Sequence, residues 1–245
     1  MRFVAVIPAR LTSTRLARKA LREIAGKSMV ARVYEAVAAS KSVSETVVAT
    51  DAAEIMEHCR RQGIPARLTS PAHRSGTDRV HEVAASIAAD VYINVQGDEP
   101  LARPEHLDLL VRLMQQPDVA VGTLKTACAA ADIDNPNAVK VVCDAAGRAL
   151  YFSRSTIPFN RGGSGQPAEA RYFKHLGFYA YRKAALDLFC SWPESPLERT
   201  ERLEQLRFLE NGISIHVAET PFDTVGVDTE EDLQRVEQIL KDLRF

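Results

Sequence analysis

The sequence has little net charge and no long apolar run. Its 31 basic and 32 acidic residues leave a formal net charge of −1, which argues against a general nucleic-acid binder, because such proteins are usually strongly basic. The apolar run 3–7 ends at Pro8 and is too short for the apolar region of a signal peptide. No stretch approaches the roughly 18 apolar residues of a membrane span. We therefore expect neither a nucleic-acid partner nor a membrane span.

Cysteine is scarce, and several well-known motifs are missing. The four cysteines have no C-x-x-C spacing, which favours reduced thiols in a cytoplasmic protein. The sequence contains neither G-x-x-x-x-G-K-[ST] nor G-x-G-x-x-G, so neither a P-loop nor a dinucleotide-binding fold is indicated. H-E-x-x-H and G-x-S-x-G are also absent, so a zinc protease or a serine hydrolase has no support.

Short apolar runs alternate with helical patterns in the first half of the chain. Strands are predicted at 3–7, 46–50, 66–69, 91–95 and 119–124. Helices are predicted between them, at 28–40, 52–63, 77–88 and 104–116. This alternation is typical of βαβ units, and it predicts an α/β fold with a mostly parallel sheet covered on both faces.

The pattern becomes richer in strands between about 125 and 182. Segments 138–144 and 148–154 predict a hairpin around Gly147, and 172–182 alternates like a strand. Beyond it we expect a strand at 213–219 and helices at 183–190, 197–212 and 228–243. We interpret residues 1–245 as one domain with a β-rich excursion.

Five cations lie within thirteen residues directly after the first predicted strand: Arg10, Arg15, Arg18, Lys19 and Arg22. In an open parallel sheet, ligands bind beyond the carboxyl ends of the strands. A loop there that carries cations and leads into a helix N-terminus can hold a polyphosphate. The alternative is a basic loop that is merely solvated.

Two aspartates follow other apolar runs. Asp98 stands in "INVQGDEPL" after the strand predicted at 91–95, and Asp228 stands in "TVGVDTEED". Two separated carboxylates, together with substrate oxygens and water, are a usual environment for Mg²⁺. The alternative is that Asp98 starts a turn and Asp228 caps a helix.

A glycine-bearing loop, "HRSGTDR" (73–79), precedes another predicted helix. Ser75, Gly76 and Thr77 could approach a nucleotide base with backbone and hydroxyl groups, and Arg79 would add charge. The alternative is an ordinary helix cap, because serine and threonine are common at helix starts.

Ten segments occur in an order that points to a known family. They are "IPARLTSTRL", "VATD", "SGTDR", "INVQGDEP", "NPNAVKVV", "ALYFSRSTIP", "KHLGFYAY", "SPLE", "LEQLR" and "GVDTEEDL", and together they span residues 7–233. Together they closely resemble the 3-deoxy-D-manno-octulosonate (Kdo) cytidylyltransferase family. The resemblance implies a Rossmann-like nucleotidyltransferase fold, CTP and Kdo as substrates, and CMP-Kdo and pyrophosphate as products, made for lipopolysaccharide.

The resemblance also implies roles for residues of the nucleotide site. Arg10, Arg15, Lys19 and Asp98 match catalytic positions. The CTP set is Ala9, Arg10, Arg15, Lys19, Ser75, Gly76, Thr77 and Arg79. Asp98 and Asp228 match Mg²⁺ ligands. One ion would organise the triphosphate, and a second would bind the Kdo carboxylate and C2 oxygen and lower the pKa of that hydroxyl. Transfer at phosphorus then needs positioning and charge stabilisation rather than a side-chain base.

Sugar-side residues are implied in the same way: Gln96, Arg161, His175, Tyr179, Glu204 and Gln205. An arginine suits the carboxylate of Kdo, and amide, imidazole and phenol groups suit its hydroxyls. Tyr179 and His175 could instead be structural, and Arg161 could stand free in solvent. The family is commonly dimeric through the β-rich region, which implies a homodimer.

The loop departs from the family pattern. The family usually reads R-L-P-G-K-P, whereas Ala17 and Arg18 stand here in place of the first proline and the glycine. Glycine tolerates positive φ and arginine resists it, so this loop is expected to be either looser or reshaped. Arg18 could add a phosphate contact.

Three rival functions remain open from the sequence. The first is a cytidylyltransferase for 8-amino-Kdo or, more distantly, a sialic acid, because one side chain can decide between a hydroxyl and an amine. The second is a nucleotide-sugar glycosyltransferase, which would release no pyrophosphate. The third is a nucleotide sensor without turnover, which would bind CTP and release none.

Overall fold

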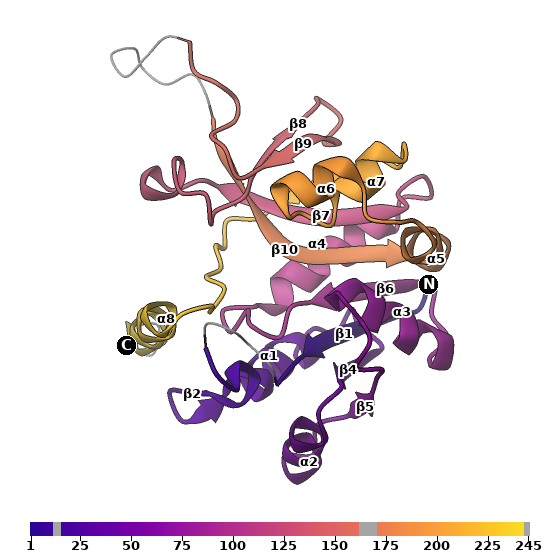
Figure 1. Cartoon of the computed structure of the whole chain (residues 1–245), viewed down its shortest axis with the longest axis vertical. Helices are drawn as coiled ribbons and strands as arrows, with labels where there is room; N and C mark the ends of the chain where they lie inside the picture. Colours follow the sequence, from indigo (N-terminus) through magenta and orange to yellow (C-terminus); the bar gives the residue numbers. More distant parts are fainter. Residues whose placement is uncertain (12–15, 162–170, 243–245) are drawn as a thin grey trace.

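The computed structural model describes residues 1–11, 16–161 and 171–242 (Figure 1). Arg15 therefore lies outside the described residues. The strands are β1 (Phe3–Ala9), β2 (Glu23–Ile24), β3 (Lys27–Ser28), β4 (Glu45–Thr50), β5 (Ala66–Leu68), β6 (Val91–Val95), β7 (Val121–Ala127), β8 (Lys140–Cys143), β9 (Ala149–Ser153), β10 (Phe173–Arg182) and β11 (Ile215–Glu219). The helices are α1 (Met29–Ala38), α2 (Ala53–Arg61), α3 (Gly76–Ser86), α4 (Pro104–Met114), α5 (Lys183–Ser191), α6 (Pro196–Glu201), α7 (Leu206–Glu210) and α8 (Glu230–Asp242). Two 3-10 turns, η1 (Lys19–Leu21) and η2 (Ala130–Asp132), complete the set.

The predicted mostly parallel sheet is confirmed. Its main path runs β11-β7-β10-β6-β1-β4-β5, and the hairpin β8–β9 extends from β10. The pairs β1–β4, β1–β6, β4–β5 and β11–β7 are parallel. Strand β10 runs antiparallel to both β6 and β7 and joins the two parallel halves. On this path, β10 alone among the described strands runs opposite to the others.

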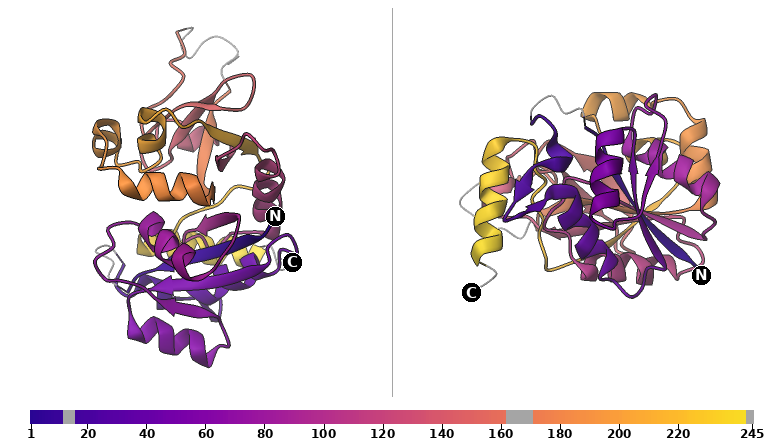
Figure 2. Two further views of the ribbon diagram at one scale, coloured as in Figure 1. Left: turned by 90° about the vertical axis from the view of Figure 1, so that its right-hand side faces the viewer. Right: turned by 90° about the horizontal axis from the view of Figure 1, so that it is seen from below.

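Both faces of the sheet are buried, as the continuous apolar runs predict. Along β1, Phe3, Ala5 and Ile7 pack in one core cluster with residues of α1 and α4. Val4 and Val6 face the opposite cluster, which includes residues of α3 and α5. Figure 2 shows these layers from the side and from below. A strand without polar alternation is thus explained by helices on both sides.

The single helix predicted over 197–212 is wrong. The chain forms two short helices, α6 and α7, because Arg202 takes a left-handed conformation with φ 54° and ends α6. The amide of Leu203 then returns to the carbonyl of Glu198 at 3.2 Å. Leu203 and Leu206 are buried as expected, so the apolar spacing was right and the continuity was not.

The basic loop also differs from its prediction. It leads into the single turn η1 and the short β2–β3 hairpin, and the first α-helix begins only at Met29. Ala25 and Gly26 turn the hairpin with φ of 47° and 79°. The helix N-terminus expected directly after the cations is therefore absent from the described residues 16–28.

Helix α8 lies beside β2, at the end of an extended segment that crosses from the other half of the molecule (Figure 1). Its start is capped by Thr229, whose hydroxyl accepts from the amide of Asp232 at 3.2 Å. Three acidic residues in its first turn suit the positive end of the helix dipole. Among the described helices, none has the length and apolar character needed to cross a membrane.

Candidate active site

A polar cavity of about 660 Å³ opens where β6 ends and β10 passes beside it. It is lined by side chains from β6, from β10, from the segment that joins α6 to α7, and from the segment before α8. The polar lining residues include Thr77, Asn94, Gln96, Asp98, Glu99, Lys174, His175, Tyr179, Tyr181, Glu204, Gln205 and Asp228. A ligand site at the carboxyl end of a parallel strand follows the general rule for open α/β sheets.

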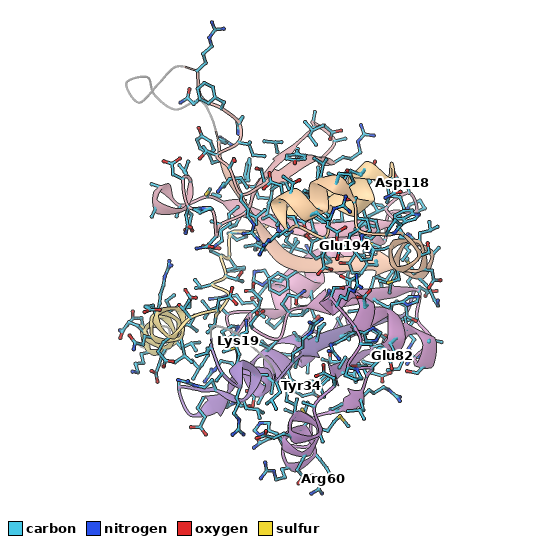
Figure 3. All side chains as sticks on the ribbon, in the orientation of Figure 1. Lys19, Tyr34, Arg60, Glu82, Asp118 and Glu194 are labelled. Carbon is cyan, nitrogen blue, oxygen red and sulfur yellow. The ribbon has the colours of Figure 1, made fainter. Side chains whose placement is uncertain are left out.

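Asp98 and Asp228 meet, although 130 positions separate them in the sequence. Lys19 donates to Asp98 Oδ2 at 2.6 Å and to Asp228 Oδ1 at 2.8 Å. The backbone adds a link from the amide of Val227 to the carbonyl of Asp98 at 2.9 Å. Figure 3 shows Lys19 between the lower half of the sheet and α8. Three residues from three distant segments thus form one charged cluster.

The ammonium of Lys19 is held in its charged form. Burial on its own would lower the pKa of Lys19, but Asp98 and Asp228 outweigh it, and the pKa is raised. The Lys19 side chain is only 17% exposed, so solvent screens the cluster weakly.

The two carboxylates fit a magnesium ion that shares its remaining positions with a ligand. Among the described residues no group of three or more His, Cys, Asp or Glu side chains could hold a metal by itself. Mg²⁺ commonly takes one or two protein carboxylates and completes its octahedron with phosphate oxygens and water. The Asp98 and Asp228 side chains are 32% and 44% exposed, so both can be reached from the cavity.

Glu99 is a site residue that the sequence did not single out. Burial, followed by the charge of Asp98, raises the pKa of its carboxyl to about 8. Its Oε2 is buried and has no hydrogen-bond partner. A Cβ added at Gly226 would lie 3.4 Å from Glu99 Oε1, so the glycine leaves room for this carboxyl. The only feature of the sequence that pointed to Glu99 as a site residue was its position directly after Asp98.

The loop between β6 and Asp98 lies against the end of β1. The amide of Gly97 donates to the carbonyl of Pro8 at 3.2 Å. A Cβ at position 97 would stand 2.6 Å from that oxygen, so only glycine fits there. The neighbouring Ala9 is buried and Arg10 is half-buried at the start of the basic loop. Ala9, Arg10 and Asp98 are thereby brought to one edge of the sheet.

The cations of the basic loop do not all face the cavity. Arg18 pairs with Glu54 of α2, and Arg22 pairs with Glu230 of α8 at 2.6 Å. The phosphate contact suggested for Arg18 is therefore replaced by a surface ion pair. Arg18 also takes φ 55° at the position where the family usually has glycine, so a left-handed residue stands here without being a glycine.

The turn Ser75–Thr77 begins α3, and its Thr77 lines the same cavity. Ser75 accepts from the amide of Asp78 at 3.1 Å, and the Asp78 carboxylate accepts from the Ser75 amide at 3.0 Å, which makes a capping box. A Cβ at Gly76 would lie 3.3 Å from Gln96 Oε1. The turn is therefore both a helix cap and a neighbour of the proposed sugar-side amide.

Arg79 corrects the sequence-based assignment to the nucleotide. Its side chain is fully buried. The guanidinium donates to Thr69 Oγ1 at 2.7 Å, to the carbonyl of Ser70 and to Asp51. Arg79 thus fixes the loop before α3 from beneath and is not among the cavity-lining residues.

His175 lines the cavity as a neutral imidazole. Burial lowers its pKa to about 3. The Thr123 hydroxyl gives its proton to the carbonyl of Phe178 at 2.7 Å, so it accepts from His175 Nε2 at 3.0 Å. This assigns the Nε2–H tautomer and leaves Nδ1 as an acceptor.

Other sugar-side residues leave polar atoms without partners at the cavity. The Tyr179 hydroxyl and Gln205 Nε2 are buried and have no partner among the described residues, and Asn94 Nδ2 is in the same condition. Asn94 and Tyr179 are directly paired across β6 and β10. Buried polar atoms are rarely left unpaired in native proteins, so this set indicates a polar ligand.

Arg161 is not brought to the other residues. It is exposed and stands next to the undescribed segment 162–170, away from the described cavity-lining residues. Lys174 occupies the cavity wall instead and pairs with Asp223 at 3.0 Å and with Asp132 at 3.7 Å. Its position in "FKHLGFYAY", two residues after Tyr172, gave no signal beyond strand alternation.

The comparisons with known proteins agree with this geometry. A family model for cytidylyltransferases matches residues 4–215. The chain is 66% identical to the 3-deoxy-manno-octulosonate cytidylyltransferase of Koribacter versatilis, over 97% of this chain and 90% of the relative. The chain belongs to the 3-deoxy-manno-octulosonate cytidylyltransferase family. A second member of that family, from Acidobacterium capsulatum, is 58% identical over 96% of this chain and 95% of its own length.

Solved structures extend the family relationship to the fold. A CMP:2-keto-3-deoxy-manno-octonic acid synthetase complexed with CTP superimposes with a TM-score of 0.93 at 42% identity, and the match covers 99% of each chain. A cytidylyltransferase from Leptospira borgpetersenii, at 17% identity and a TM-score of 0.64, shares the fold alone; the match covers 99% of this chain and 87% of that one. The Rossmann-like nucleotidyltransferase fold expected for the family is therefore confirmed.

Proposed function

We propose that this chain transfers CMP from CTP to the C2 hydroxyl of 3-deoxy-D-manno-octulosonate, forming CMP-Kdo and pyrophosphate. Besides family membership, one structural observation supports the proposal. Lys19 joins Asp98 and Asp228 at the edge of a polar cavity, and the residues around that cavity leave unpaired polar atoms. A triphosphate needs cations and a metal site, and a polyhydroxy acid needs such polar partners.

The reaction balances without a covalent protein intermediate. The C2 oxygen of the sugar forms a bond to the α-phosphorus of CTP, and the bond between that phosphorus and the bridging oxygen of the β-phosphate breaks. Pyrophosphate takes the electron pair, and the hydroxyl proton passes to solvent. The protein has to align the two reactants and to stabilise the charge on the leaving group.

Residues at the β1 and β6 edge would hold the nucleotide. Ala9 lies beside the Gly97 loop, Arg10 and Lys19 supply positive charge, and Arg15 belongs to the same loop outside the described residues. Asp98 and Asp228 would hold Mg²⁺, which supplies neutralisation of the triphosphate when bound. Lys19 would then leave the two carboxylates and turn to a phosphate oxygen.

Residues from β10 and the α6–α7 segment would hold the sugar. Neutral His175 offers Nδ1 as an acceptor, and Tyr179 and Gln205 offer unpaired donors. Gln96 would stand at the boundary between the two substrates, because its Oε1 would lie 3.3 Å from a Cβ added at Gly76. A set of this kind orients a polyol through many modest hydrogen bonds.

The cellular setting follows as part of the proposal. CMP-Kdo would serve lipopolysaccharide synthesis, in the cytoplasm, where CTP is present. We also propose a homodimer. Phe159 and Leu150, near the β8–β9 hairpin, are 86% and 61% exposed, which suits an apolar contact with a second copy.

The test is release of pyrophosphate from CTP and Mg²⁺, measured in parallel with Kdo and with 8-amino-Kdo. Asp98→Ala should lower the rate with Kdo by at least about 100-fold, because it removes a metal ligand. Asp118→Ala is the matched control: Asp118 is exposed and stands far from Lys19 in Figure 3.

Each other outcome has a definite meaning. Release with the amino sugar alone would keep the chemistry and change the substrate. CTP binding without release from either sugar would overturn the assignment as a transferase and favour a nucleotide sensor. Equal rates for Asp98→Ala and wild type would remove Asp98 from the metal site.

A further inference from the structure

The turn assigned to the nucleotide is hydrogen-bonded to the segment assigned to the sugar. The hydroxyl of Thr77 donates to Glu204 Oε2 at 2.9 Å, across 127 positions of sequence. Glu204 is thus joined to the turn that begins α3.

Thr77 joins the turn assigned to the nucleotide to the segment assigned to the sugar. Its side chain is buried, with only 4% exposure, and it stands in the first turn of α3. Tyr181 of β10 lines the same cavity as Thr77.

An ion pair fixes the segment that carries Glu204. Arg207 makes a bidentate pair with Glu198, with Nε and Nη2 at 2.7 and 2.5 Å from the two carboxylate oxygens. The same guanidinium donates to the carbonyl of Phe189 at 3.2 Å. This buried pair fixes the short link between α6 and α7 that carries Glu204 and Gln205.

We propose that Thr77 is a positioning residue that couples nucleotide binding to sugar binding through Glu204. This inference rests on the proposed function, because it takes the Ser75–Thr77 turn as part of the nucleotide site. Contacts of the nucleotide with the turn order the Thr77 hydroxyl. The hydroxyl then holds the Glu204 carboxyl in the orientation that the sugar requires.

The coupling has a measurable consequence. If the nucleotide orders the side chains that bind the sugar, each ligand raises the affinity of the other by the same factor. The dissociation constant of Kdo is measured by calorimetry with and without saturating CDP and Mg²⁺; CDP has no pyrophosphate to release. In wild type, CDP should tighten Kdo binding by at least about fivefold, which is the low end of typical coupling.

Variants of Thr77 separate coupling from simple structural support. Thr77→Ser keeps the hydroxyl and should keep the factor. Thr77→Val removes it and should reduce the factor below about twofold. Because Thr77 belongs to the proposed nucleotide site, turnover is measured with CTP saturating for each variant. Thr77→Val should then raise the KM for Kdo by a larger factor than it lowers kcat.

Glu204→Gln provides a second test should Thr77→Val fail to fold. It retains the shape of the side chain and weakens the contact with the Thr77 hydroxyl, so the factor should fall there too. Equal factors in wild type, Thr77→Val and Glu204→Gln, or a wild-type factor of one, would overturn the coupling. The proposed function is judged separately, by pyrophosphate release from wild type.

Discussion

At the scale of single residues, Arg18 sets the geometry of the basic loop. Its φ of 55° and ψ of 34° lie in the left-handed region, which costs a residue with a side chain roughly 1–2 kcal/mol. The exposed pair with Glu54 returns at most about 1 kcal/mol. The loop therefore carries a local conformational penalty close to Lys19.

We expect Arg18→Gly to be more stable than a matched glycine variant four residues further along the chain. Arg22→Gly also removes an arginine from an exposed ion pair, but Arg22 has an ordinary φ of −63°. The difference in the free energy of unfolding should be roughly 1–2 kcal/mol in favour of Arg18→Gly. Urea unfolding of both variants measures it, and an equal loss in the two would show that position 18 is unstrained.

Glu99 gives a pH-dependent prediction. Its pKa is about 8 in the folded chain, against an ordinary value of 4.5, so the folded state binds a proton that the unfolded state releases. The free energy of unfolding of wild type should then fall as pH rises from about 4.5 to 8. Glu99→Gln has no titrating group at this position and should not show this fall. The stability advantage of Glu99→Gln should grow across that range in urea titrations. A constant difference between pH 5 and pH 8 would contradict the raised pKa.

At the scale of elements, the sequence predicts well which polar residues follow the end of a strand and line the cavity. The run Val91–Val95 ends just before Gln96 and Asp98, and both lie at the cavity. The hairpin around Gly147 is likewise confirmed, because a glycine with φ 78° is what the turn requires. In both cases the signal is local, and local sequence is enough.

Elements whose ends depend on distant contacts could not be predicted from the sequence as well. Arg202 stops α6 in a left-handed conformation that is usual for glycine, and Arg207 and Glu198 then pair across the break. Leucines at 203, 206 and 209 suit either one helix or two. Burial of Arg79 and Glu99 was similarly invisible, because each depends on neighbours from other segments that no spacing reveals.

At the scale of the whole molecule, the candidate site joins parts that meet only in the folded chain. Asp98 follows β6, Asp228 precedes α8, and Lys19 belongs to the loop after β1. The sugar-side residues come from β10 and from the α6–α7 link. A ligand that bridges these parts should stabilise the entire fold rather than one segment.

We expect saturating CTP and Mg²⁺ to raise the Tm of wild type by about 5–10 °C. Ligand at 100 times its Kd contributes about 2.7 kcal/mol, and each kcal/mol shifts Tm by about 2–4 °C in a chain of this size. Asp228→Asn should lose most of the shift, and so should wild type with CTP and EDTA. Thermal scans test this, and a full shift in Asp228→Asn would place the metal elsewhere.

Strand β10 has a consequence for the order in which the chain folds. It fills the gap between β6 and β7, yet it is synthesised about eighty residues after β6. Until residues 173–182 leave the ribosome, the paired edges of β6 and β7 have no partner between them, and such open edges invite association with other chains. A nascent chain stalled before β10 is therefore the form of this protein most in need of a chaperone.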